Sequence, residues 1–155
     1  MLNKNFNRLL SGDLAKGNPV SEEHNAIDGT KTSASIGSLR CTSDVSTYEN
    51  LDSSAQGTAG LFLFTETFNE TIETYTVPTE YTNYSVTVKS VNSLSSDVVL
   101  SYSRTIMPIE DGLIKSIGII MNYMKPVLIA FENLSEPVQL TAGEPHTFTF
   151  TIKVA

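Results

Sequence analysis

Two histidines, a single cysteine and a few neighbouring carboxylates are the side chains of this 155-residue sequence that could do chemistry. His24 follows Glu22 and Glu23, and an imidazole beside two carboxylates could bind a metal ion. In a polar segment such a triplet is typical of a solvated surface, so we expect no metal there. His146 has no partner at motif spacing and begins a strand pattern, which indicates a partly buried structural residue. Cys41 has no second cysteine to pair with and indicates an inert thiol.

The short motifs that build a catalytic centre are absent from the sequence. It has no Gly-x-Ser-x-Gly nucleophile motif, phosphate loop, His-Glu-x-x-His helix or calcium-binding loop. Glu110 and Asp111 are adjacent in a turn, where neighbours seldom face one substrate as a glycosidase pair does. We therefore expect no enzymatic activity and no cofactor, and a small hydrolase is the weakest of the functions considered.

Aromatic side chains could form another kind of site, because their rings stack well on the faces of sugars. Tyr84 and Tyr102 lie in alternating strand patterns and are typical of a core edge. Tyr75, Tyr81 and Tyr123 lie in or near loops and are the candidates for ligand contact.

The charge of the chain argues against two classes of partner. Ten Lys and Arg against seventeen Asp and Glu give a net charge of −7, which repels nucleic acid backbones and anionic lipids. The longest apolar runs have the length of strands, far below the ~20 residues of a membrane span. The first thirteen residues also lack the apolar stretch of a secretory signal. We expect neither a nucleic acid nor a membrane as partner.

A short helix and a polar arm are predicted before residue 58. Apolar residues at helical spacing open the chain and are the candidate assembly anchor: Leu2, Phe6, Leu9 and Leu10. Three helical turns do not hold in water alone, so the helix must dock on its own domain or on a neighbouring chain. From residue 11 to 57, Ser, Thr, Asn, Asp and Gly dominate, and such an extended, loop-rich arm is ordered only when something holds it. Assembly into a larger particle is the simplest candidate.

Beyond residue 57 the pattern changes to strands. Apolar runs or alternations separated by turn residues predict seven or eight strands, which include 59–67, 72–77, 84–90, 98–105, 113–121, 127–131 and 146–154. The last is the clearest, because apolar residues from Phe148 to Val154 alternate with Thr and Lys. We predict an all-β fold, an antiparallel β-sandwich or jelly-roll-like domain over 58–155, with the helix and anchoring arm in 1–57.

Parts of the sequence resemble small virion structural proteins of tailed bacteriophages. The segments are Met1-Leu-Asn-Lys-Asn-Phe-Asn-Arg8, Lys115-Ser-Ile-Gly-Ile-Ile120, Pro126-Val-Leu-Ile-Ala-Phe131, Glu136-Pro-Val-Gln-Leu-Thr-Ala-Gly-Glu144 and Phe148-Thr-Phe-Thr-Ile152. They follow the order of that class: a block with an isoleucine-glycine pair, an apolar strand, a Pro-Val-x-Leu segment, a Gly-Glu turn and a Thr-rich last strand. In two places the chain departs from the class, with Ser116 where an acidic residue is usual and with an altered Gly-Thr-Gly block near 36–40.

This resemblance implies a non-enzymatic structural protein of the virion, assembled in the bacterial host cytoplasm. The role it favours is a capsid decoration or accessory protein, anchored through its arm to capsid or tail subunits and present as a homo-oligomer. The alternative is a glycan- or receptor-binding module of a tail fibre, which would expose loop aromatics around a shallow groove.

Overall fold

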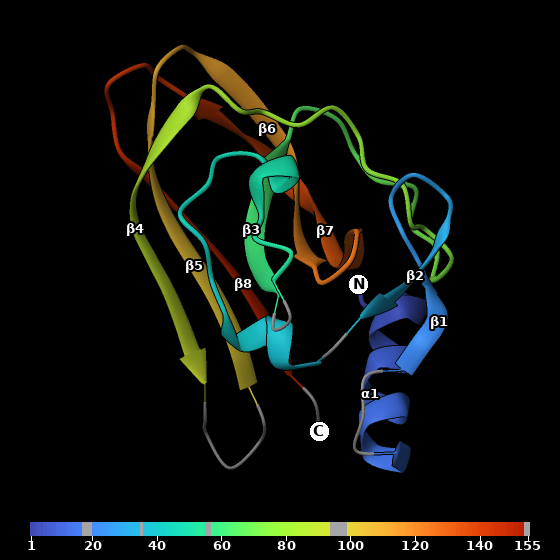
Figure 1. Cartoon of the computed structure of the whole chain (residues 1–155). Coiled ribbons are helices and arrows are strands. Elements are labelled where there is room, and N and C mark those ends of the chain that lie inside the picture. The colour runs from blue at the N-terminus through green and yellow to red at the C-terminus, as the bar shows by residue number, and fades with distance from the viewer. Residues whose placement is uncertain (17–19, 35, 55–56, 94–98, 154–155) are drawn as a thin grey trace.

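The computed structural model describes residues 1–16, 20–34, 36–54, 57–93 and 99–153 of the chain (Figure 1). These residues form one α-helix, two short 3-10 helices and eight strands. Their bounds are α1 (Lys4–Lys16), β1 (Val20–Asn25), β2 (Lys31–Ala34), η1 (Ile36–Arg40), η2 (Tyr48–Asn50), β3 (Thr58–Phe64), β4 (Tyr84–Ser93), β5 (Val99–Pro108), β6 (Gly112–Asn122), β7 (Pro126–Leu140) and β8 (His146–Lys153). The prediction of an all-β fold with a short N-terminal helix is confirmed.

Two three-stranded antiparallel sheets, with strand orders β3-β6-β7 and β4-β5-β8, make the sandwich. Side chains of both sheets meet in one core, which includes Leu63 of β3, Ile106 of β5, Ile119 of β6 and Phe150 of β8. The predicted hairpin of β4 and β5 is present, and the turn after β5 carries the chain into the other sheet. A third, two-stranded sheet of β1 and β2 lies beside α1 (Figure 1).

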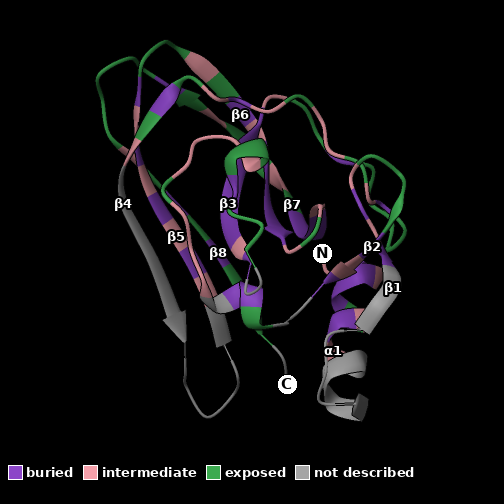
Figure 2. Cartoon of the chain, in the orientation of Figure 1, coloured by how far each residue is buried: buried purple, intermediate pink, exposed green. Residues whose placement is uncertain are grey.

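The sheet of β3, β6 and β7 is buried on both faces. Its second face carries a smaller cluster of buried apolar residues, made of Leu51, Phe62, Phe64, Phe68, Ile120, Leu128 and Phe131. Burial on both faces explains why β3 is a continuous apolar run rather than an alternation. Figure 2 shows this burial along β3 and on the first turns of α1.

Strand β8 alternates as predicted, with Phe148, Phe150 and Ile152 buried and the threonines between them exposed. Each of these threonines shares a hydrogen bond with a hydroxyl of β5: Thr147 with Thr105 (2.8 Å), Thr149 with Ser103 (3.2 Å) and Thr151 with Ser101 (3.3 Å). We call these six residues the hydroxyl face. The predicted inward position of Val154 falls outside the described residues.

Two parts of the chain differ from the sequence predictions. The segment 72–77 was predicted as a strand but is a loop. Its Thr74 carbonyl accepts a hydrogen bond from the Asn3 side chain instead of from the backbone of a neighbouring strand. The predicted arm contains the β1–β2 hairpin, whose turn is formed by Asp28 and by Gly29 with a φ of 83°. Glycine adopts this left-handed conformation without the strain that other residues suffer.

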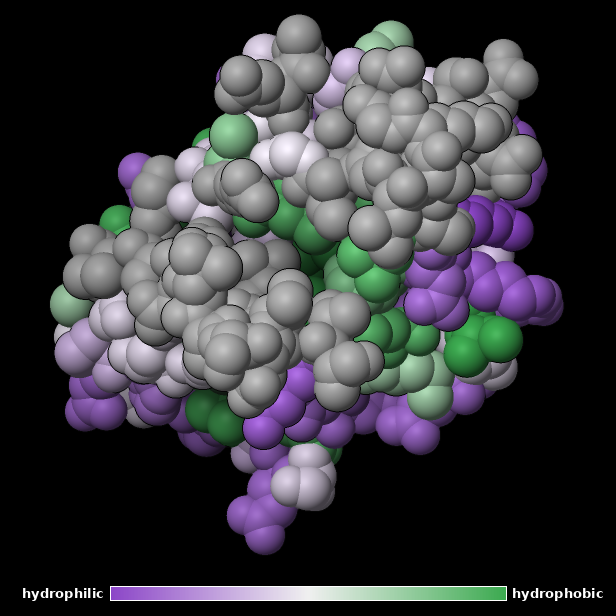
Figure 3. Space-filling view, turned by 90° about the horizontal axis from the view of Figure 1, so that it is seen from below, coloured by the Kyte–Doolittle hydropathy of each residue, from purple (hydrophilic) through white to green (hydrophobic). Residues whose placement is uncertain are grey.

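The helix α1 extends to Lys16 and packs against β1 and β7. None of the described helices is long and apolar enough to cross a membrane. Seen from below, hydrophobic residues are visible at the surface in the middle of this face of the molecule (Figure 3).

Candidate functional site

The side chains that could do chemistry are kept apart by the fold. His24 is fully buried on β1, whereas His146 is half-buried at the start of β8. The side chains of Glu22 and Glu23 lie outside the described part of the structure. Among the residues that are described, no three His, Cys, Asp or Glu side chains come together as metal ligands.

Glu110 and Asp111 hold turns together rather than facing a common substrate. The Glu110 carboxylate accepts a hydrogen bond from the side-chain amide of Asn83. The backbone carbonyl of Glu110 accepts one from the Tyr81 hydroxyl at 2.6 Å. The Asp111 carboxylate accepts the backbone N–H of Ala142 at 2.8 Å. The two carboxylates therefore bind different partners.

The structure separates the three tyrosines predicted to contact a ligand. Tyr81 is only 5% exposed and stacks on Tyr84 with ring centroids 5.9 Å apart, so its ring is not accessible. Tyr123 is half-buried in the turn between β6 and β7. Tyr75 lies in the loop between β3 and β4, where it lines a groove.

This groove has a volume of about 450 Å³, within the ~300–1,000 Å³ of small-molecule sites. One wall is the β1–β2 hairpin, which contributes Asn25 and Gly29. The other wall is the loop between β3 and β4, which contributes residues 66–69, 71 and 73–78. We call it the loop groove, and it is the candidate functional site.

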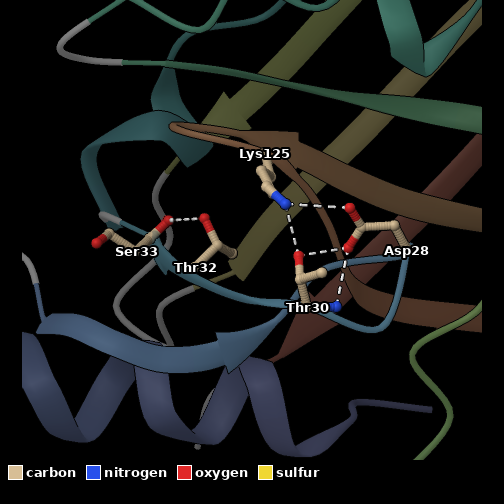
Figure 4. Close-up of polar contacts among 5 residues, drawn as sticks. All are labelled: Asp28, Thr30, Thr32, Ser33 and Lys125. Atoms are coloured by element: carbon tan, nitrogen blue, oxygen red, sulfur yellow. Dashed lines mark hydrogen bonds and ion pairs between the residues drawn. The ribbon is translucent and has the colours of Figure 1, made fainter.

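The hairpin wall is held by a small polar network (Figure 4). The Asp28 carboxylate accepts the Thr30 hydroxyl at 2.6 Å, the Thr30 N–H at 2.9 Å and the Lys125 ammonium at 3.1 Å. These bonds, those of Thr30 above all, lower the pKa of Asp28 to about 2. Lys125 also donates to the Thr30 hydroxyl at 2.7 Å, which ties the turn to the loop before β7.

Asn5, a fully buried residue of α1, also fixes the hairpin wall. Its amide nitrogen donates to the Asn25 carbonyl at 2.8 Å, and its amide oxygen accepts the Asn25 N–H at 2.9 Å. The Asn5 side-chain amide therefore pairs with the backbone of Asn25, the last residue of β1, as the backbone of a neighbouring strand would.

The loop wall is fixed by two further asparagines. Asn3 is fully buried and donates to the carbonyls of Thr74 at 3.0 Å and Leu128 at 2.8 Å. Asn133 of β7 donates to the Phe68 carbonyl at 2.9 Å and accepts the Phe68 N–H at 2.7 Å. Both walls are thus preformed before any ligand arrives.

Sequence reasoning missed these asparagines. For Asn3 a signal existed, because an Asn directly before a helix is a preferred N-cap. Its side-chain oxygen accepts the backbone N–H groups of Asn5 and Phe6 at 3.0 and 3.3 Å. Asn133 has no comparable local signal, since its partner lies 65 residues away.

A second polar cluster surrounds Arg104, which is 2% exposed. Its guanidinium donates to the carbonyls of Ser43 and Val45, both at 2.8 Å, and to the Tyr84 hydroxyl at 3.4 Å. The space beside it is only about 10 Å³, too small for a ligand and about the least that a water needs. This cluster therefore fastens the segment around Ser43 and Val45 to the sandwich.

Glu80 lies next to this cluster and accepts the Tyr48 N–H at 3.3 Å. Burial raises the pKa of Glu80 to about 8, and the nearby Glu49 carboxylate adds to the rise, against the opposing effect of the Tyr48 hydrogen bond and Arg104. Its neutral form is therefore the main one at neutral pH.

Of the four predicted anchor residues, two are inside this chain's own core. Phe6 and Leu9 are each 2% exposed and pack in the main core cluster. Leu2, which bridges to Ala130 of β7, and Leu10 are half-buried against the same cluster. The helix thus docks on its own domain, and attachment of another chain through these residues stays a prediction.

No protein-family model, curated protein or solved structure matches this chain.

Proposed function

We propose that this chain is a non-enzymatic structural component of a tailed-phage virion, a decoration or accessory protein that contacts capsid or tail subunits. The proposal joins the sequence resemblance to one structural observation, the hydroxyl face on β5 and β8. Subunits of a particle meet through surfaces that carry few charges at their centre, and the hydroxyl face has this composition.

All six residues of the hydroxyl face are uncharged, although the chain carries a net charge of −7. The centres of protein interfaces are depleted of charge, because a buried charge loses its hydration. In the pairs of Thr149 with Ser103 and of Thr151 with Ser101, one hydroxyl donates to the other, so the second hydroxyl keeps its donor for a partner. Neighbouring acidic subunits can meet here without burying like charges.

The rigidity of the molecule also suits a building block. Asn3, Asn133 and Arg104 each use their side chains to join backbone segments that are far apart in the sequence. A subunit fastened in this way keeps its shape when a particle is assembled.

The test compares two single changes of exposed threonines, Thr149→Asp on the hydroxyl face and Thr141→Asp in the turn before β8. Tailed particles are purified on a density gradient from the culture that makes the protein, and gel densitometry measures the amount of the chain in them. We expect the Thr141 variant to be incorporated like the natural chain and the Thr149 variant to be at least tenfold depleted. Circular dichroism checks that both variants fold.

Two results would contradict the proposal. If the natural chain is missing from the particles, the virion role is wrong. If the Thr149 variant is incorporated like the natural chain, the hydroxyl face is not the contact.

A second candidate function, the glycan- or receptor-binding module, is favoured by the loop groove with Tyr75 in its wall.

A further inference from the structure

We infer that the loop groove binds a short, electrically neutral carbohydrate. The inference rests on the second candidate function and names its ligand. Carbohydrate binding does not depend on the virion role, because a structural subunit of a particle and a free binding module could both carry this groove.

Tyr75 offers an unused aromatic ring to a ligand. The ring is half-buried in the groove wall, and it has no ring partner or hydrogen bond among the described residues. Tyr81, by contrast, is stacked on Tyr84 and donates its hydroxyl to a carbonyl. An amphipathic ring that is held in a wall but left unpaired is suited to stack on the apolar face of a sugar ring.

Polar side chains with unused hydrogen-bonding capacity line the same groove. The amide of Asn69 and the hydroxyls of Thr67 and Thr76 make no hydrogen bond within the described structure. An amide both donates and accepts, and so does a hydroxyl, which matches the neighbouring hydroxyl groups of a sugar. These side chains differ from Asn3 and Asn133, whose amides are used to hold the fold.

The charge of the groove selects against anionic sugars. Glu66 and Glu73 line it, and none of its described lining residues is Lys or Arg. Lys4 forms an ion pair with Glu73, whereas the exposed Glu66 carboxylate has no ion-pair partner among the described residues and accepts the Thr79 hydroxyl at 3.4 Å. A carboxylate accepts hydrogen bonds from sugar hydroxyls but repels sialic acids, uronic acids and sugar phosphates. Neutral hexoses and N-acetylhexosamines fit this environment.

The groove is also preorganised, which lowers the entropic cost of binding. Its loop wall is fixed through Asn3 and Asn133, and its hairpin wall through Asn5 and Lys125. A ligand therefore meets side chains that are already in place.

The experiment uses the full chain and a panel of neutral oligosaccharides of glucose, galactose and N-acetylglucosamine, together with sialylated counterparts. Saturation-transfer NMR detects binding, and isothermal titration calorimetry measures affinity. We expect at least one neutral oligosaccharide to bind with a Kd in the millimolar range or below. Its sialylated counterpart should have a Kd at least tenfold higher.

Variants connect the binding to the groove. Tyr75→Ala should lower the affinity at least tenfold, Tyr75→Phe should keep most of it, and Asn69→Ala should lower it severalfold. Tyr123→Ala is the matched control, because Tyr123 is half-buried but outside the groove, and it should bind as the natural chain does. Thermal denaturation midpoints confirm that the variants are folded.

Three results would overturn the inference: no binding of any neutral oligosaccharide in the panel, preference for the sialylated forms, or equal affinity of the Tyr75→Ala variant. Each is measured on the isolated chain, so none depends on whether the chain is found in particles. Conversely, absence from particles would leave the sugar measurements unaffected.

Discussion

The guanidinium carbon of Arg104 on β5 lies 5.1 Å from the centroid of the Phe62 ring on β3. These two strands belong to different sheets, so this cation–π contact joins the two sheets. Gly60 leaves room for the contact, since a Cβ there would lie 3.1 Å from Arg104 Nη2 and 3.0 Å from the Phe62 ring. Together with its bonds to the carbonyls of Ser43 and Val45, this arginine joins three parts of the molecule.

We predict that Arg104→Lys lowers the free energy of unfolding by about 2–3 kcal/mol, because an ammonium cannot replace the planar fork that reaches two carbonyls. Urea denaturation measures the change. The control, Lys115→Arg at a half-buried position, should alter the stability by less than about 0.5 kcal/mol. Equal stability of Arg104→Lys and the natural chain would contradict the fastening role of the guanidinium.

Glu80 should make the stability of the chain fall as the pH rises. The pKa of Glu80 is about 8 in the folded chain and near 4.5 in the unfolded chain, so between these two pH values the folded chain keeps a proton that the unfolded chain releases. The stability that Glu80 contributes is therefore fully present below pH 4.5 and is lost as the pH rises to 8. Tyr48, Glu49, Tyr84 and Arg104 are the titratable or charged groups around it.

Glu80→Gln, which stays neutral, should flatten the decline between pH 5 and 8 when urea denaturation is repeated across this range. Glu136→Gln, at an exposed site, is the control and should keep the slope. A slope that does not change in the Glu80 variant would show that this carboxyl group is not responsible.

Phe150→Ala should cost on the order of 3–5 kcal/mol, because it opens a cavity in the main core, where Phe150 is opposite Tyr102. Thr149→Ala, one residue away, removes an exposed hydroxyl and its solvent-exposed hydrogen bond with Ser103, and should cost well under ~1 kcal/mol. Chemical denaturation of both variants measures the two effects. Similar losses would mean that the two faces of β8 are assigned incorrectly.

Asn3→Asp should destabilise the chain by at least about 2 kcal/mol at neutral pH. The carboxylate keeps an acceptor for the first helical N–H groups, but it has no donor for the carbonyls of Thr74 and Leu128. Asn7→Asp, at an exposed position of the same helix, is the control. Thermal unfolding compares the two, and equal midpoints would argue against the role of the Asn3 amide.

Strands with one buried and one exposed face could be predicted well from the sequence. The alternation from His146 to Lys153 gave the correct burial of Phe148, Phe150 and Ile152, because successive side chains of a strand point to opposite faces of the sheet. The apolar run of β3 also indicated a strand, although not that both its faces would be covered.

Elements that depend on partners distant in the sequence were not predictable in this way. The β1–β2 hairpin has few apolar residues, and only the Asp28-Gly29 pair is typical of a turn there. The segment 72–77 has strand-like alternation, yet contacts with Asn3 and with Lys4, whose N–H bonds the Ile72 carbonyl, hold it as a loop.

The loop groove shows the same limit for the candidate site. Tyr75 was among the aromatic candidates, but nothing local distinguished it from Tyr81, which the fold buries. The walls of the groove come from segments about forty residues apart, and their approach depends on the asparagines. The position of each candidate therefore followed from the tertiary structure.

The contact between Asn3 and the Leu128 carbonyl also has a consequence for biosynthesis. The two residues are separated by 125 positions, so the ribosome completes one long before the other. At ~5–20 residues per second, the helix that follows Asn3 must wait roughly 6–25 s for the strand on which it docks. During that time its apolar stripe lacks the strand on which it docks, and such transiently exposed apolar surface is the kind that chaperones shield in nascent chains.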